Sequence, residues 1–146
     1  DAPSTITRLQ NMGTPDYLIS AACQLVVAQR LARKNCKDCK VPDDDVTPKV
    51  LQDLGFTAEV ASRVKAIKGK GCPKCKDTGY KGRQGIYEIL SVSKPLKEAI
   101  LRQATTPELR EIAVKEGFQT MQDMGRRLIA SGDLNFREFE RVLSGE

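Results

Sequence analysis

The sequence predicts a mostly α-helical chain with a small β element, an α+β fold. Helix-start signals recur along the chain, a glycine-punctuated segment follows residue 77, and four of the five cysteines form two closely spaced pairs. A chain of 146 residues can bury one sizeable core or two small ones. Because 40% of its residues are hydrophobic and 29% are charged, the composition excludes a disordered chain.

The predicted helices share one type of start, in which threonine supplies the N-cap oxygen and proline takes the first helical position. Threonine-proline pairs at 14–15, 47–48 and 106–107 fit this pattern. Asn135 and Glu138 form a capping-box pattern for the last helix. The expected helices cover residues 2–12, 15–34, 47–54, 57–67, 94–103, 107–116, 121–130 and 136–143.

The segment after the second cysteine pair does not have the helical spacing of apolar residues that the predicted helices show. Gly79, Gly82 and Gly85 punctuate it, and residues 86–90 read as a short strand, so a hairpin or a strand packed on helices is expected. Residues 41–45, between the cysteine pairs, are expected to form a loop.

No apolar run approaches the ~20 residues that span a bilayer. The longest apolar stretch, residues 17–32, contains several polar side chains, and no cleavable signal peptide is evident. We therefore expect a cytoplasmic protein. The chain begins at Asp1 without an initiator methionine, and we expect it to be a piece of a longer protein.

The two C-x-x-C pairs predict a metal site. Cys36 and Cys39 form the first pair, Cys72 and Cys75 the second, and 32 residues separate them. Four thiolates would bind zinc tetrahedrally and leave no open position for a catalytic water, so the zinc would be structural. A redox dithiol or disulfide and an iron site remain alternatives. Cys23 lies among apolar residues and is expected to be an ordinary core residue.

Positive charge is concentrated around the second pair. Residues 63–83 contain eight basic residues and one acidic residue, whereas the whole chain has a net charge of +5. Four thiolates on zinc leave a site charge of −2, so these lysines either compensate the metal site or form a surface for a partner.

Signatures of catalysis are missing from the sequence. It contains no histidine, which removes Ser-His, Cys-His and His-metal chemistry, and no G-x-x-x-x-G-K-[ST] phosphate loop. The glycines of the 79–85 segment precede a strand rather than a helix, which is the wrong order for a phosphate cradle. This chain alone is expected to catalyse nothing.

Three linked motifs carry a family resemblance. They are D-A-P-S-T-I-T-R-L at the start, then Q-R-L-A-R-K-N-C-K-D-C-K, and finally G-C-P-K-C-K-D-T-G-Y-K-G-R-Q-G-I-Y-E-I-L. Over essentially its whole length the chain resembles the C-terminal part of a secretion-type traffic ATPase. It is most similar to type IV pilus assembly (extension) ATPases and their type II secretion relatives. The paired cysteines favour an extension or secretion motor, because retraction-type relatives generally lack them.

The resemblance implies a hexameric motor at the cytoplasmic face of the bacterial inner membrane. Such a motor hydrolyses ATP with Mg²⁺ and drives pilin polymerisation through an inner-membrane platform protein. It is peripheral to the membrane and has no nucleic-acid partner. The family's nucleotide-binding motifs precede the Ala-Pro-Ser-Thr run, so ATP and Mg²⁺ would bind only in the full-length protein.

The resemblance also implies a division of the chain and roles for single residues. The chain would hold the end of a RecA-like ATPase domain, a four-cysteine zinc insert and a helical C-terminal subdomain. The zinc ligands would be the four paired cysteines, and Arg83 would approach nucleotide phosphates in the assembled motor; a salt bridge of Arg83 within the hairpin is the alternative. The implied boundaries are 1–35 for the RecA-like helices, 36–76 for the insert, 77–92 for the hairpin or strand returning to the core, and 93–146 for the subdomain.

Three further interpretations stay open. One is a fragment of a type II secretion ATPase. Another is a free-standing zinc module that binds nucleic acid, although few aromatic residues lie near the cysteines. The third is a chaperone-like zinc module, because C-P-K-C-K-D-T-G-Y partly matches the cysteine-glycine repeats of a heat-shock co-chaperone family. The acidic run at 43–45 is expected to be a solvated loop.

Overall fold

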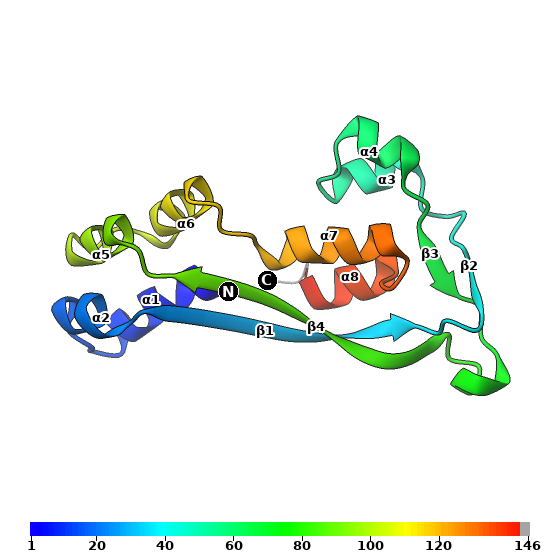
Figure 1. The fold of residues 1–146 in the computed structure, drawn as a ribbon, viewed down its shortest axis with the longest axis horizontal. Coiled ribbons are helices and arrows are strands. Elements are labelled where there is room, and N and C mark those ends of the chain that lie inside the picture. The colour runs from blue at the N-terminus through cyan, green and yellow to red at the C-terminus, as the bar shows by residue number, and fades with distance from the viewer. Residues whose placement is uncertain (144–146) are drawn as a thin grey trace. The chain divides into compact units, whose positions relative to one another are not determined.

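The computed structural model describes residues 1–143 (Figure 1). About 48% of the chain is helical and 20% is strand, which confirms the predicted α+β class. Within the described residues the strands form two two-stranded sheets. β1 (Leu25–Asn35) pairs with β4 (Tyr80–Ser91), and β2 (Lys40–Pro42) pairs with β3 (Ile67–Gly69).

Helices precede, separate and follow the strands. Eight are α-helical and one is a short 3-10 helix, η1, within residues 1–143. They are α1 (Ala2–Asn11), α2 (Asp16–Ala22), α3 (Pro48–Asp53), α4 (Ala58–Arg63), η1 (Pro73–Cys75), α5 (Lys94–Leu101), α6 (Thr106–Lys115), α7 (Met121–Ser131) and α8 (Phe136–Leu143).

The threonine-proline starts are only partly confirmed. Thr47 caps α3 as predicted, because its hydroxyl accepts a hydrogen bond from the Val50 N–H at 3.3 Å. The cap of α6 is Thr105, one residue earlier than predicted, and α2 begins after Pro15 with no side-chain cap. A threonine caps a helix only where its own backbone is extended, and three-dimensional context selects which threonine of a run meets that condition.

The chain divides into two compact units. Residues 1–29 and 87–120 form the first, and residues 30–86 with the described part of 121–146 form the second. The core of the first unit is built from helices α1, α2, α5 and α6, with Ile6, Ile19, Ile100 and Leu109 almost fully buried in it. The second unit contains the cysteines that are paired in the sequence, and helices α7 and α8 pack on each other within it.

The helix predicted over residues 15–34 is wrong. Its first part is α2, but the chain becomes extended at Cys23 and continues as strand β1. Burial alternates along β1: Val26 and Ala32 are buried, whereas Val27 and Leu31 are exposed. Two adjacent valines favour a strand. Pairing with β4, more than forty residues later, decides between the helical and the strand period.

Three other predicted boundaries also change. The helix expected over residues 57–67 ends at Arg63, and its last residue, Ile67, begins β3. The loop expected at 41–45 begins with β2, in which Val41 is paired with Lys68. The strand expected at 86–90 is lengthened to β4. Each short strand exists because a distant segment supplies its hydrogen-bonding partner, and a local pattern does not report such a partner.

Among residues 1–143, no helix combines the length and the apolar character that crossing a membrane requires.

Candidate metal centre

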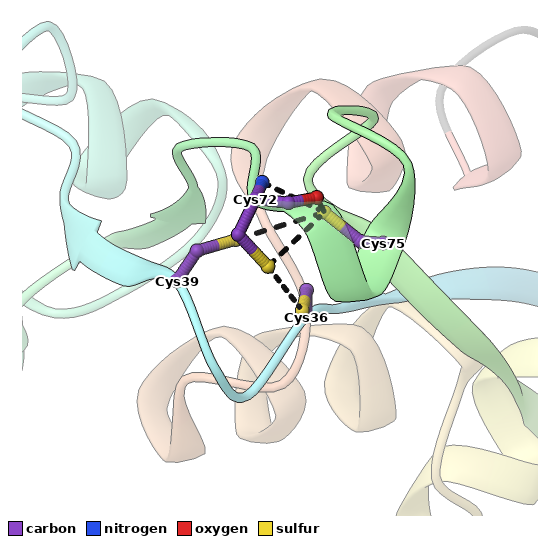
Figure 2. Close-up of side chains that lie close together, drawn as sticks. All are labelled: Cys36, Cys39, Cys72 and Cys75. Atoms are coloured by element: carbon purple, nitrogen blue, oxygen red, sulfur yellow. Dashed lines mark hydrogen bonds between the residues drawn. The ribbon is translucent and has the colours of Figure 1, made fainter.

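The fold brings the four paired cysteines to one point in the second unit (Figure 2). Cys36 follows β1 directly and Cys39 precedes β2, while Cys72 caps η1 and Cys75 ends it. All four Sγ atoms lie within 4.8 Å of one another. Cys36 and Cys75 are buried, and Cys39 and Cys72 are half-buried. The predicted grouping of these four residues is confirmed.

The sulfur spacing fits a tetrahedral metal ion. Sγ of Cys72 lies 3.7 Å from both Cys36 Sγ and Cys75 Sγ, and Cys39 Sγ lies 3.9 Å from Cys75 Sγ. A tetrahedron with zinc–sulfur bonds of about 2.3 Å has edges of about 3.8 Å. All four cysteines are free thiols in the structure, at distances well above a disulfide bond. The donor set therefore suits Zn²⁺, which prefers four thiolates in this geometry.

Backbone N–H groups point at two of the sulfurs. Gly71 N donates to Cys39 Sγ at 3.3 Å, while Cys72 N and Gly79 N each donate to Cys75 Sγ at 3.2 Å. Such bonds stabilise negative charge on sulfur and orient the ligand. They depend on tight turns in which Gly71 and Gly79 have positive φ angles of 106° and 80°.

Two of the thiols, the half-buried Cys39 and the buried Cys75, differ in acidity. Burial raises the pKa of the Cys39 thiol to about 11, and only the Gly71 N–H bond opposes it. Burial also raises the pKa of Cys75, but hydrogen bonds from the Cys72 and Gly79 N–H groups outweigh it, and the pKa falls to about 6. The two N–H bonds to Cys75 therefore favour the thiolate form at this sulfur, and a bound metal ion would favour the thiolate form of all four cysteines.

Two glycines allow the chain to cross itself beside the cluster. A Cβ placed on Gly69 would lie 1.9 Å from the Gly79 carbonyl oxygen, and one on Gly79 would lie 2.5 Å from the Gly69 carbonyl oxygen. Cys36 N donates to that same Gly79 carbonyl at 2.9 Å. The crossing therefore connects β3 to the segment that leads from η1 into β4.

We expect Gly79→Ala to destabilise the second unit more than Gly132→Ala does. Both glycines have a positive φ, so each alanine costs about 1–2 kcal/mol of backbone strain. At Gly132 the nearest atom would be 3.5 Å from the new Cβ, whereas at Gly79 backbone atoms must move, which adds roughly 1–3 kcal/mol. Denaturant unfolding of both variants measures this difference. Equal destabilisation would contradict the close crossing.

Asn35 joins the cysteine cluster to the loop between α7 and α8. Its backbone N–H donates to the Asp133 carbonyl at 2.8 Å. Its side-chain amide donates to the carbonyls of Ile67 and Gly132 at 3.1 and 3.0 Å. Since Asn35 immediately precedes Cys36, these bonds hold the first ligand turn in place.

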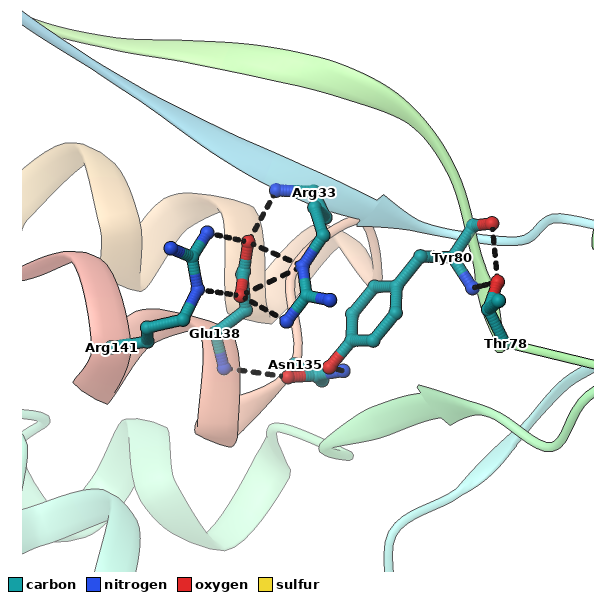
Figure 3. Close-up of polar contacts among 6 residues, drawn as sticks. All are labelled: Arg33, Thr78, Tyr80, Asn135, Glu138 and Arg141. Atoms are coloured by element: carbon teal, nitrogen blue, oxygen red, sulfur yellow. Dashed lines mark hydrogen bonds and ion pairs between the residues drawn. The ribbon is translucent and has the colours of Figure 1, made fainter.

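A buried carboxylate organises the polar contacts next to the cluster (Figure 3). Glu138 is fully buried, and it accepts hydrogen bonds from Arg33 N at 2.5 Å, Arg33 Nη2 at 3.0 Å and Arg141 Nε at 2.6 Å. The Arg33 guanidinium lies 4.1 Å from the centroid of the Tyr80 ring. The Tyr80 hydroxyl accepts from Asn135 Nδ2 at 3.0 Å, and Asn135 Oδ1 caps the Glu138 N–H at 2.8 Å.

Only half of the predicted capping box forms. Asn135 caps α8 as expected, but the Glu138 carboxylate turns to the two arginines instead of the Asn135 N–H. Burial raises the pKa of the Glu138 carboxyl, and hydrogen bonds from Arg141 and Arg33 outweigh this and hold the pKa at about 2. The sequence pattern pointed to Asn135 and Glu138 but carried no signal for Arg33.

The other candidate residues lie apart from the cluster. Arg83 is exposed on β4, and the salt bridge predicted as its alternative role is not formed within residues 1–143. Cys23 is half-buried against the core of the first unit and belongs to no group of possible metal ligands among the described residues. Gly69 and Asn35, which no sequence pattern indicated, support the cluster instead.

Comparison with known proteins defines the family to which the chain belongs. Residues 1–141 match the family model described as type II/IV secretion system protein, so the chain belongs to this family.

Individual relatives fall in two groups. The chain is 36% identical over 138 residues to the type IV pilus assembly ATPase PilB of Myxococcus xanthus. This alignment covers 94% of this chain and 24% of the relative. It is 37% identical over 141 residues to PilB of Pseudomonas aeruginosa, covering 97% of this chain and 25% of the relative. It is 34% identical over 142 residues to the type II secretion system protein HxcR of Pseudomonas aeruginosa, and the alignment covers 97% of this chain and 26% of the relative. The chain thus spans about a quarter of the length of these relatives.

Proposed function

We propose that this chain is part of a hexameric traffic ATPase that powers type IV pilus assembly by pilin polymerisation. The family match across residues 1–141, with relatives named as pilus assembly ATPases, carries the proposal. Its partners would be the other subunits of the hexamer and an inner-membrane platform protein. The motor would act at the inner face of the inner membrane as a peripheral, cytoplasmic protein.

In this proposal the chain contributes structure rather than catalysis. No phosphate loop occurs in its sequence, so ATP and Mg²⁺ would be held by other parts of the full-length protein. Residues 1–35 would end the RecA-like domain, 36–76 would form the zinc insert, 77–92 would return to the core, and 93–146 would form a C-terminal subdomain.

The zinc ion would be held by the thiolates of Cys36, Cys39, Cys72 and Cys75. The sulfur distances of 3.7–3.9 Å support this assignment. With all four positions filled by sulfur, the ion would supply no Lewis-acid site and would act as a cross-link. It would close the 32-residue insert between the pairs, which contains α3, α4 and the antiparallel strand pair β2–β3.

A segment exchange tests the assignment to pilus assembly. We would replace the matching segment of Pseudomonas aeruginosa PilB with residues 1–141 and measure ATP hydrolysis and surface pili, and make the same exchange in HxcR and measure secretion. We expect the PilB chimaera to assemble pili and the HxcR chimaera not to support secretion. Restored secretion without pili would favour the type II secretion alternative, and failure of both folded chimaeras to hydrolyse ATP would contradict the motor assignment.

The same pilus chimaera tests the proposed role of Arg83 near nucleotide phosphates. Arg83→Ala should weaken nucleotide binding by at least roughly 10-fold, because a charge-assisted hydrogen bond is worth about 1.5–3 kcal/mol. Lys81→Ala is the matched control, since Lys81 is also exposed and lies two residues earlier on β4. Unchanged nucleotide affinity in Arg83→Ala would exclude this role.

A further inference from the structure

A pocket of about 530 Å³ lies in the second unit, between the insert and the start of α8. Its walls come from the loop that follows β2, from β3, and from the first turn of α8. None of the four paired cysteines lines it, so it is separate from the sulfur cluster. A pocket of this volume accommodates a small organic ligand.

Contacts between the insert and the last two helices hold the walls of this pocket in place. Arg126 of α7 donates from Nη1 to the Leu54 carbonyl, at the end of α3, at 3.0 Å. Lys40 of β2 pairs with Asp133 at 3.5 Å. The side-chain amide of Asn35 joins β3 to the loop between α7 and α8. The insert is therefore anchored at three points, and the pocket is formed before a ligand binds.

The pocket gathers charged side chains that are not paired with one another. Lys68, Lys70 and Arg137 supply three positive charges, and Asp43 and Asp45 supply two negative ones. None of the five forms an ion pair within residues 1–143. The Asp43 carboxylate accepts a backbone hydrogen bond from Asp45 N at 3.3 Å. Charges of both signs are therefore available to a ligand.

A ligand for this pocket must carry groups of two kinds. An apolar molecule would cover the five charged side chains without giving them hydrogen bonds, which costs free energy. A simple polyanion would be attracted by the three basic side chains but repelled by the two aspartates. The charges therefore point to a molecule with an anionic end and a separate end that donates hydrogen bonds to carboxylates.

Two aromatic rings line the pocket, and one of them suits a flat ligand. Tyr80 lies against the Arg33 guanidinium at 4.1 Å from its ring centroid, and its hydroxyl accepts from Asn135 (Figure 3). Phe136 is the second ring, and it is half-buried at the start of α8. Nucleic acid bases stack on aromatic side chains, so Phe136 offers a platform for a base.

The first turn of α8 favours an anion next to this platform. Asn135, Phe136 and Arg137 are the cap and the first two residues of the helix, and all three line the pocket. Asn135 Oδ1 accepts from the Glu138 N–H, whereas the N–H groups of the first two helical residues have no acceptor within the helix. Together with the three basic side chains, these N–H groups can bind phosphate oxygens.

We propose that this pocket binds a purine nucleotide. The base stacks on Phe136 and donates from its amino group to the two aspartates, while the phosphates lie among the three basic side chains. This inference goes beyond the proposed function, because the pocket contains no phosphate loop and Arg83 does not line it.

Calorimetric titration of the 146-residue chain without Mg²⁺ tests the class of ligand. ADP should bind at least roughly tenfold more tightly than adenosine or pyrophosphate, because each of these keeps only one of the two sets of contacts. Glycerol 3-phosphate, which carries the phosphate of a lipid headgroup without a base, should bind as weakly as pyrophosphate. No binding of ADP at about 1 mM would overturn the proposal, as would equal affinities for ADP and either phosphate compound.

Matched variants test the position of the site. Phe136→Leu should weaken ADP binding roughly tenfold. Its control is Phe118→Leu, which changes a half-buried phenylalanine of the first unit, outside this pocket. Arg137→Gln should also weaken ADP binding roughly tenfold. Its control is Arg127→Gln, at an exposed position of α7 that does not line the pocket. Equal losses in a variant and its control would overturn the proposal.

A measurement on the unchanged chain does not depend on how the variants fold. ADP should shift the amide NMR signals of residues 68–70 and 136–137, which line the pocket. Shifts confined to other residues would overturn the proposal, whatever the variants show. Zinc content and thermal unfolding identify variants that have lost their fold. These outcomes are independent of the segment exchange, because the chimaeras can hydrolyse ATP when this pocket binds no nucleotide, and the reverse.

Discussion

Replacing Cys72 with serine is expected to abolish zinc binding and to unfold the segments around the cysteine cluster. Structural zinc in a four-cysteine site is worth about 10–16 kcal/mol, far more than a short insert with few buried residues gains from packing. Elemental analysis should find about one zinc per chain in the wild type and almost none in the variant. The Gly71 and Gly79 amides, which donate to Cys39 and Cys75, should lose their protection from hydrogen exchange.

Cys23→Ser is the matched control, because Cys23 is a cysteine of the same chain that contacts the core of the first unit. It should retain about one zinc per chain and the protected amides around the cluster. Full zinc content in Cys72→Ser would contradict the proposed ligand set. Equal amide protection in the metal-free and metal-loaded wild type would show that the metal does not support the fold.

Replacing Glu138 with glutamine is expected to destabilise the second unit by about 2–3 kcal/mol at pH 7. The carboxylate is fully buried and accepts charge-assisted hydrogen bonds from both Arg33 and Arg141, each of which is worth about 1.5–3 kcal/mol. The loss stays at or below the lower end of their sum, because the arginine side chains are 48% and 55% exposed and can turn to water. Denaturant unfolding followed by circular dichroism measures the change.

The effect of Glu138 depends on pH in a defined direction. The pKa of its carboxyl is about 2 in the folded chain and near 4.5 when unfolded, so the folded state favours the charged form. Its contribution is fully present above about pH 4.5 and is lost as the pH falls towards 2. The difference in stability between wild type and Glu138→Gln should therefore be constant from pH 7 to about pH 5 and then shrink. Comparing the two proteins at each pH cancels the effects of acid on the thiolates.

Glu59→Gln serves as the control for this prediction. Glu59 pairs with Arg63 at 3.6 Å in the same unit, but its side chain is 83% exposed, so its loss should cost less than about 0.5 kcal/mol. A cost for Glu138→Gln as small as that for Glu59→Gln, or a difference that persists unchanged down to pH 2.5, would show that the buried carboxylate does not hold the two arginines.

Local sequence patterns predicted the helical parts of the fold well. Helices α3, α5, α6, α7 and α8 lie close to their predicted positions, since each has a cap or glycine stop and a periodic apolar face. The same patterns failed for residues 25–35, where the apolar residues fit both a helix and a strand. Hydrogen bonding to β4 selected the strand, and that contact joins segments more than forty residues apart.

The sequence by itself predicted the grouping of the four paired cysteines and the family. Cysteine pairs at chelating spacing have few chemical alternatives, and three long motifs rarely agree by chance. Only the tertiary structure decided how the ligands are supported: the backbone crossing of Gly69 and Gly79, the anchoring of Asn35, and the capture of Arg33 and Arg141 by Glu138. These contacts join residues that are far apart in the chain, and their energies depend on burial and distance, which no local pattern encodes.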